Sequence, residues 1–273
     1  MTESPRVCLI TGSATGIGAA CARLFAAQGW HVGISHLGDA TLDEAQAVLA
    51  DCSAAGTASG AQAMLHPLDV RDDAACVAFA QAALSRWGRI DALINCAAVT
   101  NFIAHSNLSV LDGDEFHRTY DVNVVGAYQM ARACFDALRL AGGQGGATGA
   151  ARAAGSIVNV SSIGGVLGRG SSMAYAASKG ALNTLTLAMA RSMAPLVRVN
   201  AIAPGFVDGG LPSRMLDELH HQQAVHTQTQ ASVLKRVSQP QEVAALAWFL
   251  TTQAPGITGD VVMMDNGLHL NAG

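Results

Sequence analysis

Residues 6–18, R-V-C-L-I-T-G-S-A-T-G-I-G, are the stretch that decides the fold of this chain. The first five residues suit a short buried strand, and apolar residues at helical spacing begin at Ile17. Between strand and helix, Gly12 permits a tight turn, Gly16 lets the backbone approach a pyrophosphate, and Gly18 allows close packing of helix on strand. The helix N-terminus adds N–H groups for phosphate. The stretch predicts a dinucleotide-binding turn, and an ordinary glycine-rich connection is the alternative.

The alternation of strand and helix continues to the end of the chain. Further strands are expected at residues 30–35, 63–66, 90–95, 157–160, 197–202 and 260–265. Helices are expected between them at residues 41–55, 74–87, 114–140, 175–193 and 242–250, the last opened by a capping box at 238–241. This order predicts one α/β domain over residues 1–273, a doubly wound parallel sheet with helices on both faces.

Two stretches interrupt that pattern. Residues 141–155 are rich in glycine and alanine, and we interpret them as an exposed loop insertion within the domain. Residues 206–236 include a polar, irregular segment rich in glutamine and histidine, and their position predicts a mobile lid over a ligand. The polar loop that follows Thr100 is expected to border the substrate.

Composition excludes several classes of protein. Hydrophobic residues make up 50% of the 273 residues, charged residues 13%, and the net charge is −4, which argues against a nucleic-acid-binding face. No apolar run approaches ~18 residues, so no membrane span is expected, and the short polar start leaves no room for a signal peptide. The six scattered cysteines and the group His220, His221 and His226 lack metal-site spacing. We therefore expect a cytoplasmic protein with reduced thiols, no metal, and a solvated histidine face.

Residues 155–179 carry the candidate chemistry. A buried strand ends in Ser161 and Ser162, and a later helix holds Tyr175 and Lys179 one turn apart on the same face. A nearby ammonium favours the phenolate, and a partly desolvated lysine together with the charge of a bound cationic cofactor could lower the pKa of the tyrosine, ordinarily about 10. A serine hydroxyl would hold a substrate oxygen as charge develops on it. The set indicates proton transfer at a carbonyl or an alcohol; a surface tyrosine with an unrelated lysine is the alternative.

Other polar residues at strand ends have two interpretations each. Asp69 could contact adenine or cap a helix, and Asp72 or Asp73 could take the capping role instead. Asn123, inside an expected helix, could hold a water near the active centre or satisfy a backbone carbonyl. The segment 35–39, S-H-L-G-D, has no acidic residue at the strand end for a ribose 2′-hydroxyl, which favours NADP(H) over NAD(H), although Asp39 opposes a 2′-phosphate.

Together these motifs resemble the short-chain dehydrogenase/reductase family over nearly the whole chain. They are T-G-x-x-x-G-I-G at 11–18, N-x-A at Asn95, Asn123, Ser162, Y-x-x-x-K at Tyr175 and Lys179, and P-G at 204–205. The resemblance implies a Rossmann fold of about seven strands with Tyr175 as the acid/base. Lys179 would lower its pKa and hold the nicotinamide ribose, Ser162, preferred to Ser161, would bind the substrate oxygen, and Asn123 would complete a water-linked proton relay.

The implied cofactor contacts extend along the strand ends. They are Gly12, Ser13, Thr15, Gly16, Ile17 and Gly18 at the pyrophosphate; His36 and Leu37 after the second strand; Asp69 and Val70 at the adenine; Asn95 and Ala97 between; Tyr175 and Lys179; and Pro204, Gly205 and Val207 at the nicotinamide. Three positions depart from the family pattern: Ala98 and Asn266 stand where glycine is usual, and Gly209 where threonine often is. These departures would affect the orientation and affinity of the cofactor and not the reaction that is catalysed.

The resulting hypothesis is an NAD(P)-dependent oxidoreductase that transfers hydride between nicotinamide and a small-molecule alcohol or ketone. A catalytically silent NAD(P)-binding or sensing protein is the alternative from another class. Enoyl reduction fits less well, because in the family that chemistry goes with a wider Tyr–Lys spacing. The resemblance also implies a homotetramer or homodimer. The substrate is not named by the sequence.

Overall fold

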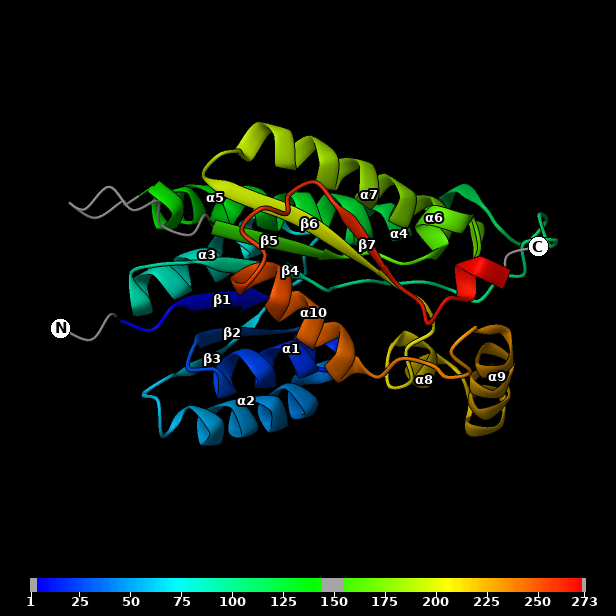
Figure 1. The fold of residues 1–273 in the computed structure, drawn as a ribbon, viewed down its shortest axis with the longest axis horizontal. Helices are drawn as coiled ribbons and strands as arrows, with labels where there is room; N and C mark the ends of the chain where they lie inside the picture. Colours follow the sequence, from blue (N-terminus) through cyan, green and yellow to red (C-terminus); the bar gives the residue numbers. More distant parts are fainter. Residues whose placement is uncertain (1–3, 144–154, 272–273) are drawn as a thin grey trace.

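Seven parallel strands form the centre of the structure, a computed structural model that describes residues 4–143 and 155–271 (Figure 1). Their order is β3-β2-β1-β4-β5-β6-β7, and every neighbouring pair is parallel. The strands are β1 Val7–Ile10, β2 His31–His36, β3 Ala63–Pro67, β4 Ala92–Asn95, β5 Gly155–Val160, β6 Val197–Pro204 and β7 Val261–Met264. The strand order reverses between β1 and β4, which is where ligands bind in open α/β sheets. The predicted doubly wound sheet is confirmed.

Helices cover both faces of the sheet (Figure 1). On one face lie α1 (Gly16–Ala27), α2 (Leu42–Gly56) and α10 (Pro240–Thr252); on the other lie α3 (Asp73–Trp87), α4 (Gly113–Tyr120), α5 (Ala127–Gly143) and α7 (Met173–Met193). Strand β1 shows the reason. Cys8 and Ile10 join the apolar core on the α1 side, while Val7 and Leu9 join the core on the α3 side. Successive side chains of a strand point to opposite faces, so a wholly apolar strand requires a cover on each face.

The predicted helix over residues 114–140 differs from the observed one in its middle. Residues Asp121–Gly126 form a π-helical segment, labelled η2, between α4 and α5. A π-helical turn inserts an extra residue into the helix and commonly occurs at functional sites. In this chain it carries Asn123.

Both predicted bounds of the loop at residues 141–155 are wrong. Helix α5 continues to Gly143 and β5 already begins at Gly155, while residues 144–154 lie outside the described residues. The capping box of α10 also lies one residue later than predicted. It pairs Gln239 with Glu242, because Gln239 is the last residue before the helix.

The expected irregular segment after residue 211 is largely helical. It contains α8 (Leu211–Met215) and α9 (Glu218–Ala231), and short 3₁₀ helices lie at Gly38–Thr41, η1, and Leu268–Asn271, η3. Pro212 stands in the first turn of α8, and the Asp217 carboxylate accepts a hydrogen bond from the His220 N–H at the start of α9. Both are favourable helix-start positions, which periodicity in this polar segment does not reveal. None of the helices in the described ranges has the length and apolar character needed to cross a membrane.

Candidate active site

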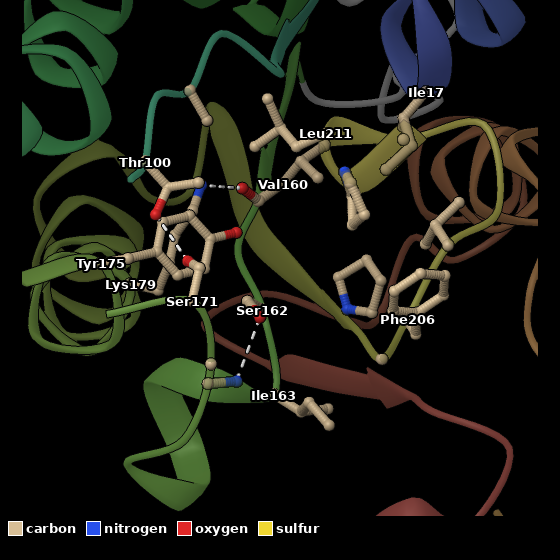
Figure 2. A pocket seen from close by; sticks show the side chains of 18 of the residues that line it. Ile17, Thr100, Val160, Ser162, Ile163, Ser171, Tyr175, Lys179, Phe206 and Leu211 are labelled. Carbon is tan, nitrogen blue, oxygen red and sulfur yellow. Dashed lines mark hydrogen bonds between the residues drawn. The ribbon is translucent and has the colours of Figure 1, made fainter. Parts of the chain in front are cut away.

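A cavity of about 720 Å³ lies at the carboxyl ends of the central strands (Figure 2). Its wall combines Gly12 after β1, Ala97 after β4, Ser162 after β5 and Pro204 at the end of β6. The segment from Phe206 into α8 and α9 closes another side, so the predicted lid does border the cavity. The loop after Thr100 also lines it, as expected.

The glycine loop is shaped by close backbone contacts. A Cβ on Gly12 would lie 2.8 Å from the Cα of Ala97, and one on Gly16 would lie 2.9 Å from the carbonyl oxygen of Gly209. Both glycines also have positive φ, 62° and 53°. A Cβ on Gly18 would lie 2.3 Å from the carbonyl oxygen of Gly12, so this glycine is required for packing of α1 on its own loop. Each of the three glycines thus has a separate steric role; the predicted approach of Gly16 to a pyrophosphate stays a prediction.

The start of α1 suits an anion. Thr15, the residue before the helix, makes no side-chain capping hydrogen bond, and the first turn holds no acidic residue. The Arg214 guanidinium of α8 donates a 3.0 Å hydrogen bond to the Thr15 hydroxyl and also lines the cavity. N–H groups at a helix start and an adjacent guanidinium are the groups that bind phosphate in proteins.

Tyr175 and Lys179 project from α7 into the cavity wall near Ser162 (Figure 2). Ser172 caps α7 by accepting a 3.1 Å hydrogen bond from the Tyr175 N–H. The Lys179 Nζ donates to the Val160 carbonyl oxygen at 2.8 Å and lies 5.6 Å from the centroid of the Tyr175 ring. The Ser162 hydroxyl accepts from the Gly164 N–H at 3.0 Å and hydrogen-bonds to the tyrosine side chain. The predicted trio is therefore assembled at one point.

Ser161 is committed elsewhere. Its hydroxyl donates to the Asn183 side-chain oxygen at 2.6 Å and lies 3.2 Å from the Lys179 carbonyl oxygen. Although it also borders the cavity, these contacts bind it to α7. Ser162 is the serine that points toward the tyrosine.

The protein alone does not produce the low pKa that Lys179 and a bound cationic cofactor together are expected to give Tyr175. Burial raises the pKa of Tyr175 to about 12, and the hydrogen bond with Ser162 lowers it only in part. Burial likewise lowers the pKa of Lys179, which is 2% exposed, to about 8. Removal from water disfavours the charged form of each group. The tyrosine hydroxyl is therefore protonated at neutral pH.

Asn123 lies behind the tyrosine and does not line the cavity. Its side-chain oxygen accepts from the Val99 N–H at 2.8 Å, and its side-chain nitrogen donates to the Val99 carbonyl and to the Ser178 hydroxyl, both at 3.0 Å. Ser178 in turn donates to the Tyr175 carbonyl oxygen at 2.8 Å. Both amide N–H groups are therefore used within the protein, and the contacts favour the packing interpretation of Asn123.

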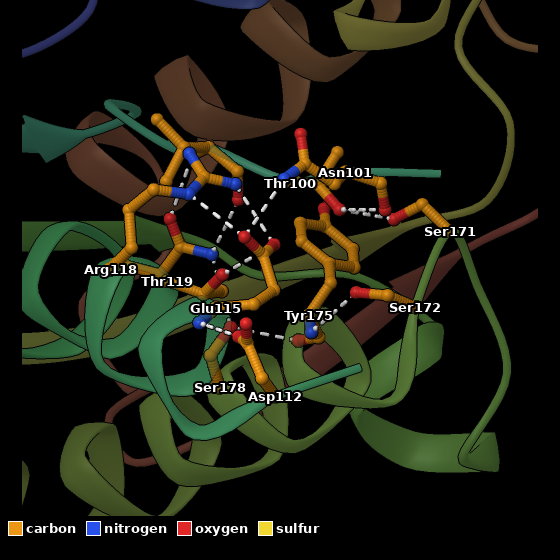
Figure 3. A network of polar contacts seen from close by, with 12 residues as sticks. Thr100, Asn101, Asp112, Glu115, Arg118, Thr119, Ser171, Ser172, Tyr175 and Ser178 are labelled. Carbon is orange, nitrogen blue, oxygen red and sulfur yellow. Dashed lines mark hydrogen bonds and ion pairs between the residues drawn. The ribbon is translucent and has the colours of Figure 1, made fainter. Parts of the chain in front are cut away.

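A second polar network, which the sequence did not reveal, holds the loop after Thr100 (Figure 3). The Thr100 and Ser171 hydroxyls lie 2.5 Å apart, and the Ile103 N–H donates to the Ser171 carbonyl oxygen at 2.8 Å. The buried Glu115 carboxylate accepts from Asn101 at 2.8 Å and from Arg118 at 2.9 Å. These contacts bind the loop to α4 and to the segment before α7, so that wall of the cavity has a fixed position.

The structure brings together only part of the predicted cofactor set. The predicted residues that line the cavity are Gly12, Thr15, Gly16, Ile17, Ala97, Ser162, Tyr175, Lys179, Pro204, Gly205 and Val207. Those that do not are Ser13, Gly18, His36, Leu37, Asp69, Val70, Asn95 and Asn123. The lining side chains that the sequence did not single out are mainly apolar, among them Phe102, Leu167 and Leu268.

Three predicted contacts have other partners in the structure. Asp69 forms an ion pair with Arg71 at 2.6 Å, while Asp72 caps α3 as proposed. The buried Asn95 side chain donates to the Ala127 carbonyl at 3.1 Å and to Asn159 at 3.0 Å, so it joins β4 to α5 and β5. The Ser13 hydroxyl donates to the Ile10 carbonyl at 2.8 Å and accepts from the Ser35 N–H at 2.8 Å.

The histidine group is also not uniformly solvated. His220 is exposed, but the His221 ring lies 3.0 Å from the Ser213 hydroxyl and 3.2 Å from the Asp208 carboxylate. These contacts join α9 to Asp208 and Ser213, which precede it within the predicted lid, residues 206–236.

Comparison with known proteins gives full-length matches. A family model described as enoyl-(acyl carrier protein) reductase matches residues 12–269. The chain is 31% identical over 268 residues to the cis-4-hydroxycyclohexanecarboxylate dehydrogenase of Sinomonas cyclohexanicum, covering 96% of each chain. It is 30% identical over 267 residues to the 3-oxoacyl-[acyl-carrier-protein] reductase of Thermotoga maritima, covering 96% of this chain and 97% of the relative.

Solved structures match equally far. A crystal structure from Burkholderia xenovorans, described as a short-chain dehydrogenase/reductase, is 49% identical with a TM-score of 0.87, covering 98% of this chain and 100% of the other. The fold, the residues that line the cavity and these matches all indicate the same family of proteins.

Proposed function

The chain belongs to the short-chain dehydrogenase/reductase family, and from that premise we propose that it is an NAD(P)-dependent oxidoreductase acting on an alcohol or a ketone. The observation that carries the proposal is the meeting of Tyr175, Lys179 and Ser162 at the cavity end of β5. When bound, the dinucleotide would donate or accept the hydride. The protein's own residues would bind the substrate oxygen and move its proton.

Tyr175 is the proposed acid/base. With a pKa of about 12 its hydroxyl is protonated at neutral pH and is available to donate a proton to a ketone oxygen during reduction, and a pKa nearer the working pH would make it a stronger acid. Ser162 would hold that oxygen by a second hydrogen bond, which strengthens as negative charge develops. For alcohol oxidation the hydroxyl must first lose its proton, and the Lys179 ammonium, 5.6 Å from the ring centroid, would stabilise the phenolate.

The residues around the glycine loop fit a dinucleotide. The pyrophosphate would occupy the start of α1, where Gly16 allows close backbone approach and Arg214 supplies a positive charge. NADP(H) is the proposed cofactor, because β2 ends in His36 and not in an acidic residue. His36 and Leu37 would then lie beside the adenosine ribose.

The names of the relatives favour carbonyl and alcohol chemistry. The Sinomonas and Thermotoga proteins are named as a hydroxy-acid dehydrogenase and a 3-oxoacyl reductase. The matching family model carries the description of an enoyl reductase. The one-turn spacing of Tyr175 and Lys179 favours carbonyl and alcohol chemistry for this chain, since enoyl reduction in the family goes with a wider Tyr–Lys spacing.

Tyr175→Phe tests this function. General acid catalysis contributes on the order of 10²–10⁴-fold, so the variant should lose nearly all ketone reduction while NADPH still binds, because the phenyl ring keeps its packing. Turnover is followed by nicotinamide absorbance, and binding by titration with NADPH and NADH side by side. Tyr128→Phe, at an exposed tyrosine on α5, is the matched control and should keep full activity.

Two results would change the conclusion. Full activity of Tyr175→Phe would remove the tyrosine from the mechanism. Tight NADPH binding by a wild-type protein that reduces no ketone and oxidises no alcohol in a broad panel would favour the silent or sensing protein.

A further inference from the structure

The cavity wall has an unbalanced set of charges. Among its described lining residues are three cations, Arg169, Lys179 and Arg214, and no aspartate or glutamate. The Lys179 ammonium donates a hydrogen bond to the Val160 carbonyl oxygen beside the tyrosine, and the Arg214 guanidinium donates one to the Thr15 hydroxyl at the glycine loop. Arg169 is left without an assigned role.

Arg169 also lacks a structural partner. Within residues 4–143 and 155–271 its side chain forms no hydrogen bond, ion pair or ring contact, whereas most arginines in those ranges bind a carboxylate or a carbonyl. Arg191 on α7 is the comparable case: both arginines are exposed, but only Arg169 lines the cavity. Arg169 is therefore a guanidinium in a cavity wall whose five donors are not used by the fold.

The backbone that carries Arg169 is held in place. It lies between Gly168 and Gly170, which have φ of 66° and 136°, and its carbonyl oxygen would be 2.4 Å from a Cβ on Gly164. The following Ser171 is fixed by Thr100 and by the Ile103 N–H. A Cβ on Gly170 would lie 3.5 Å from Cδ1 of Tyr175, so Arg169 starts close to the proposed acid/base.

Much of the remaining cavity wall is apolar. Ile163, Leu167, Phe206 and Leu268 line it, and Figure 2 shows Phe206 on the side of the view opposite Tyr175. An alcohol or ketone bound here would contact apolar side chains along its body and one guanidinium. A guanidinium binds carboxylate and phosphate through paired N–H donors.

We propose that Arg169 binds an anionic group, carboxylate or phosphate, on an otherwise apolar alcohol or ketone substrate. The inference rests on the proposed function, because it places the reacting oxygen at Tyr175 and Ser162. The anionic group would then lie several bonds from the reacting carbon, at the position that Arg169 occupies beside Gly170. Arg169 would select substrates by charge and would take no part in the proton transfer.

The test is binding of matched compounds to the NADPH-loaded protein by isothermal titration. Cyclohexanecarboxylate should bind at least about tenfold more tightly than cyclohexanecarboxamide, which has the same shape without the charge, since hydrogen bonds to charged groups are the stronger ones. Arg169→Gln should abolish that preference, and Arg191→Gln should leave it unchanged. Higher ionic strength should weaken only the acid. Cyclohexyl phosphate is titrated as well. Whichever of cyclohexanecarboxylate and cyclohexyl phosphate binds more tightly shows whether the anionic group of the substrate is a carboxylate or a phosphate.

The outcomes separate this inference from the proposed function. A loaded protein that binds acid and amide equally, or an Arg169→Gln variant that keeps the preference, overturns the role of Arg169 and leaves the oxidoreductase proposal intact. A wild-type protein that binds neither NADPH nor NADH contradicts the proposed function. The acid and the amide are then titrated into the protein alone. Equal binding of the two compounds, or a preference for the acid that survives in Arg169→Gln, again overturns the role of Arg169.

Discussion

At the scale of single residues, Tyr175 and Lys179 show how environment changes a side chain's chemistry. Their spacing in the sequence places them on one face of a helix, and the structure confirms the contact, with the ammonium 5.6 Å from the ring centroid. Their burial has the opposite effect on the pKa from that expected of an ammonium beside a phenol. Desolvation raises the pKa of the tyrosine and lowers that of the lysine, because each loses the hydration of its charged form.

Lys179 should make stability depend on pH. Its pKa in the folded protein is about 8, lowered by burial from 10.5. Above about pH 8 the unfolded chain therefore holds a proton that the folded chain has lost, so the contribution of Lys179 to the free energy of unfolding rises with pH. The expected slope is about 1.4 kcal/mol per pH unit. Lys179→Met removes this contribution, so its stability relative to wild type should fall between about pH 8 and 10, measured by urea denaturation in the presence of reductant.

Lys235→Met is the control, since it replaces the other lysine of the chain, which is exposed. Its difference from wild type should stay constant over the same range. The same constancy for Lys179→Met would show that this ammonium is hydrated in the folded protein.

At the scale of elements, the π-helical segment and the lid were the features that periodicity did not predict. The segment Asp121–Gly126 interrupts an otherwise continuous helix, and its Asn123 connects Val99, in the loop after β4, to Ser178 on α7. A π-helical turn keeps the apolar pattern on both sides, so the sequence resembles one long helix. In the lid, the polar composition of α9 conceals a helix that begins at the Asp217 cap.

Asn123→Ala should reduce stability more than it reduces catalysis. It leaves the Val99 N–H, the Val99 carbonyl and the Ser178 hydroxyl without this partner, and unsatisfied buried groups cost about 1–3 kcal/mol each. Because Val99 is only partly buried and the Ser178 hydroxyl keeps its hydrogen bond to the Tyr175 carbonyl oxygen, we expect a loss of about 2–5 kcal/mol in the free energy of unfolding. Urea denaturation measures it, and Asn107→Ala, at an exposed turn, should change stability by less than about 0.5 kcal/mol. Wild-type stability with a large loss of kcat would instead support the water-holding role.

At the scale of the whole molecule, the cavity exists because parallel strands bring distant segments to one edge. Residues that follow β1, β4, β5 and β6 meet there, together with the lid. The outer face of the helices over β5 also carries exposed apolar side chains, including Val125, Tyr128 and Leu187 at 44%, 45% and 39% exposure. Exposed apolar groups that form a contiguous patch are typical of surfaces that bind another protein.

We expect this helical face to join copies of the chain into a dimer or tetramer. Sedimentation velocity should then give a mass that is two or four times 27.9 kDa. Tyr128→Glu places a charge in that contact and should shift the protein toward the monomer, because an unpaired charge is costly to bury. Leu219→Glu, on the exposed face of α9, should not. A wild-type protein that sediments as a monomer at all concentrations would exclude the assembly.

The amino-acid sequence by itself determined the layered α/β fold, the glycine loop and the positions of Ser162, Tyr175 and Lys179. These follow from local spacing: strand and helix periods, turn glycines, and residues one helical turn apart. Only the tertiary structure decided that Asn95, Asp69 and Asn123 have partners away from the cavity, that burial raises the pKa of Tyr175, and that Arg169 has no side-chain partner among the described residues. Burial and hydrogen-bond partners depend on residues far apart in the chain, and no local pattern contains them.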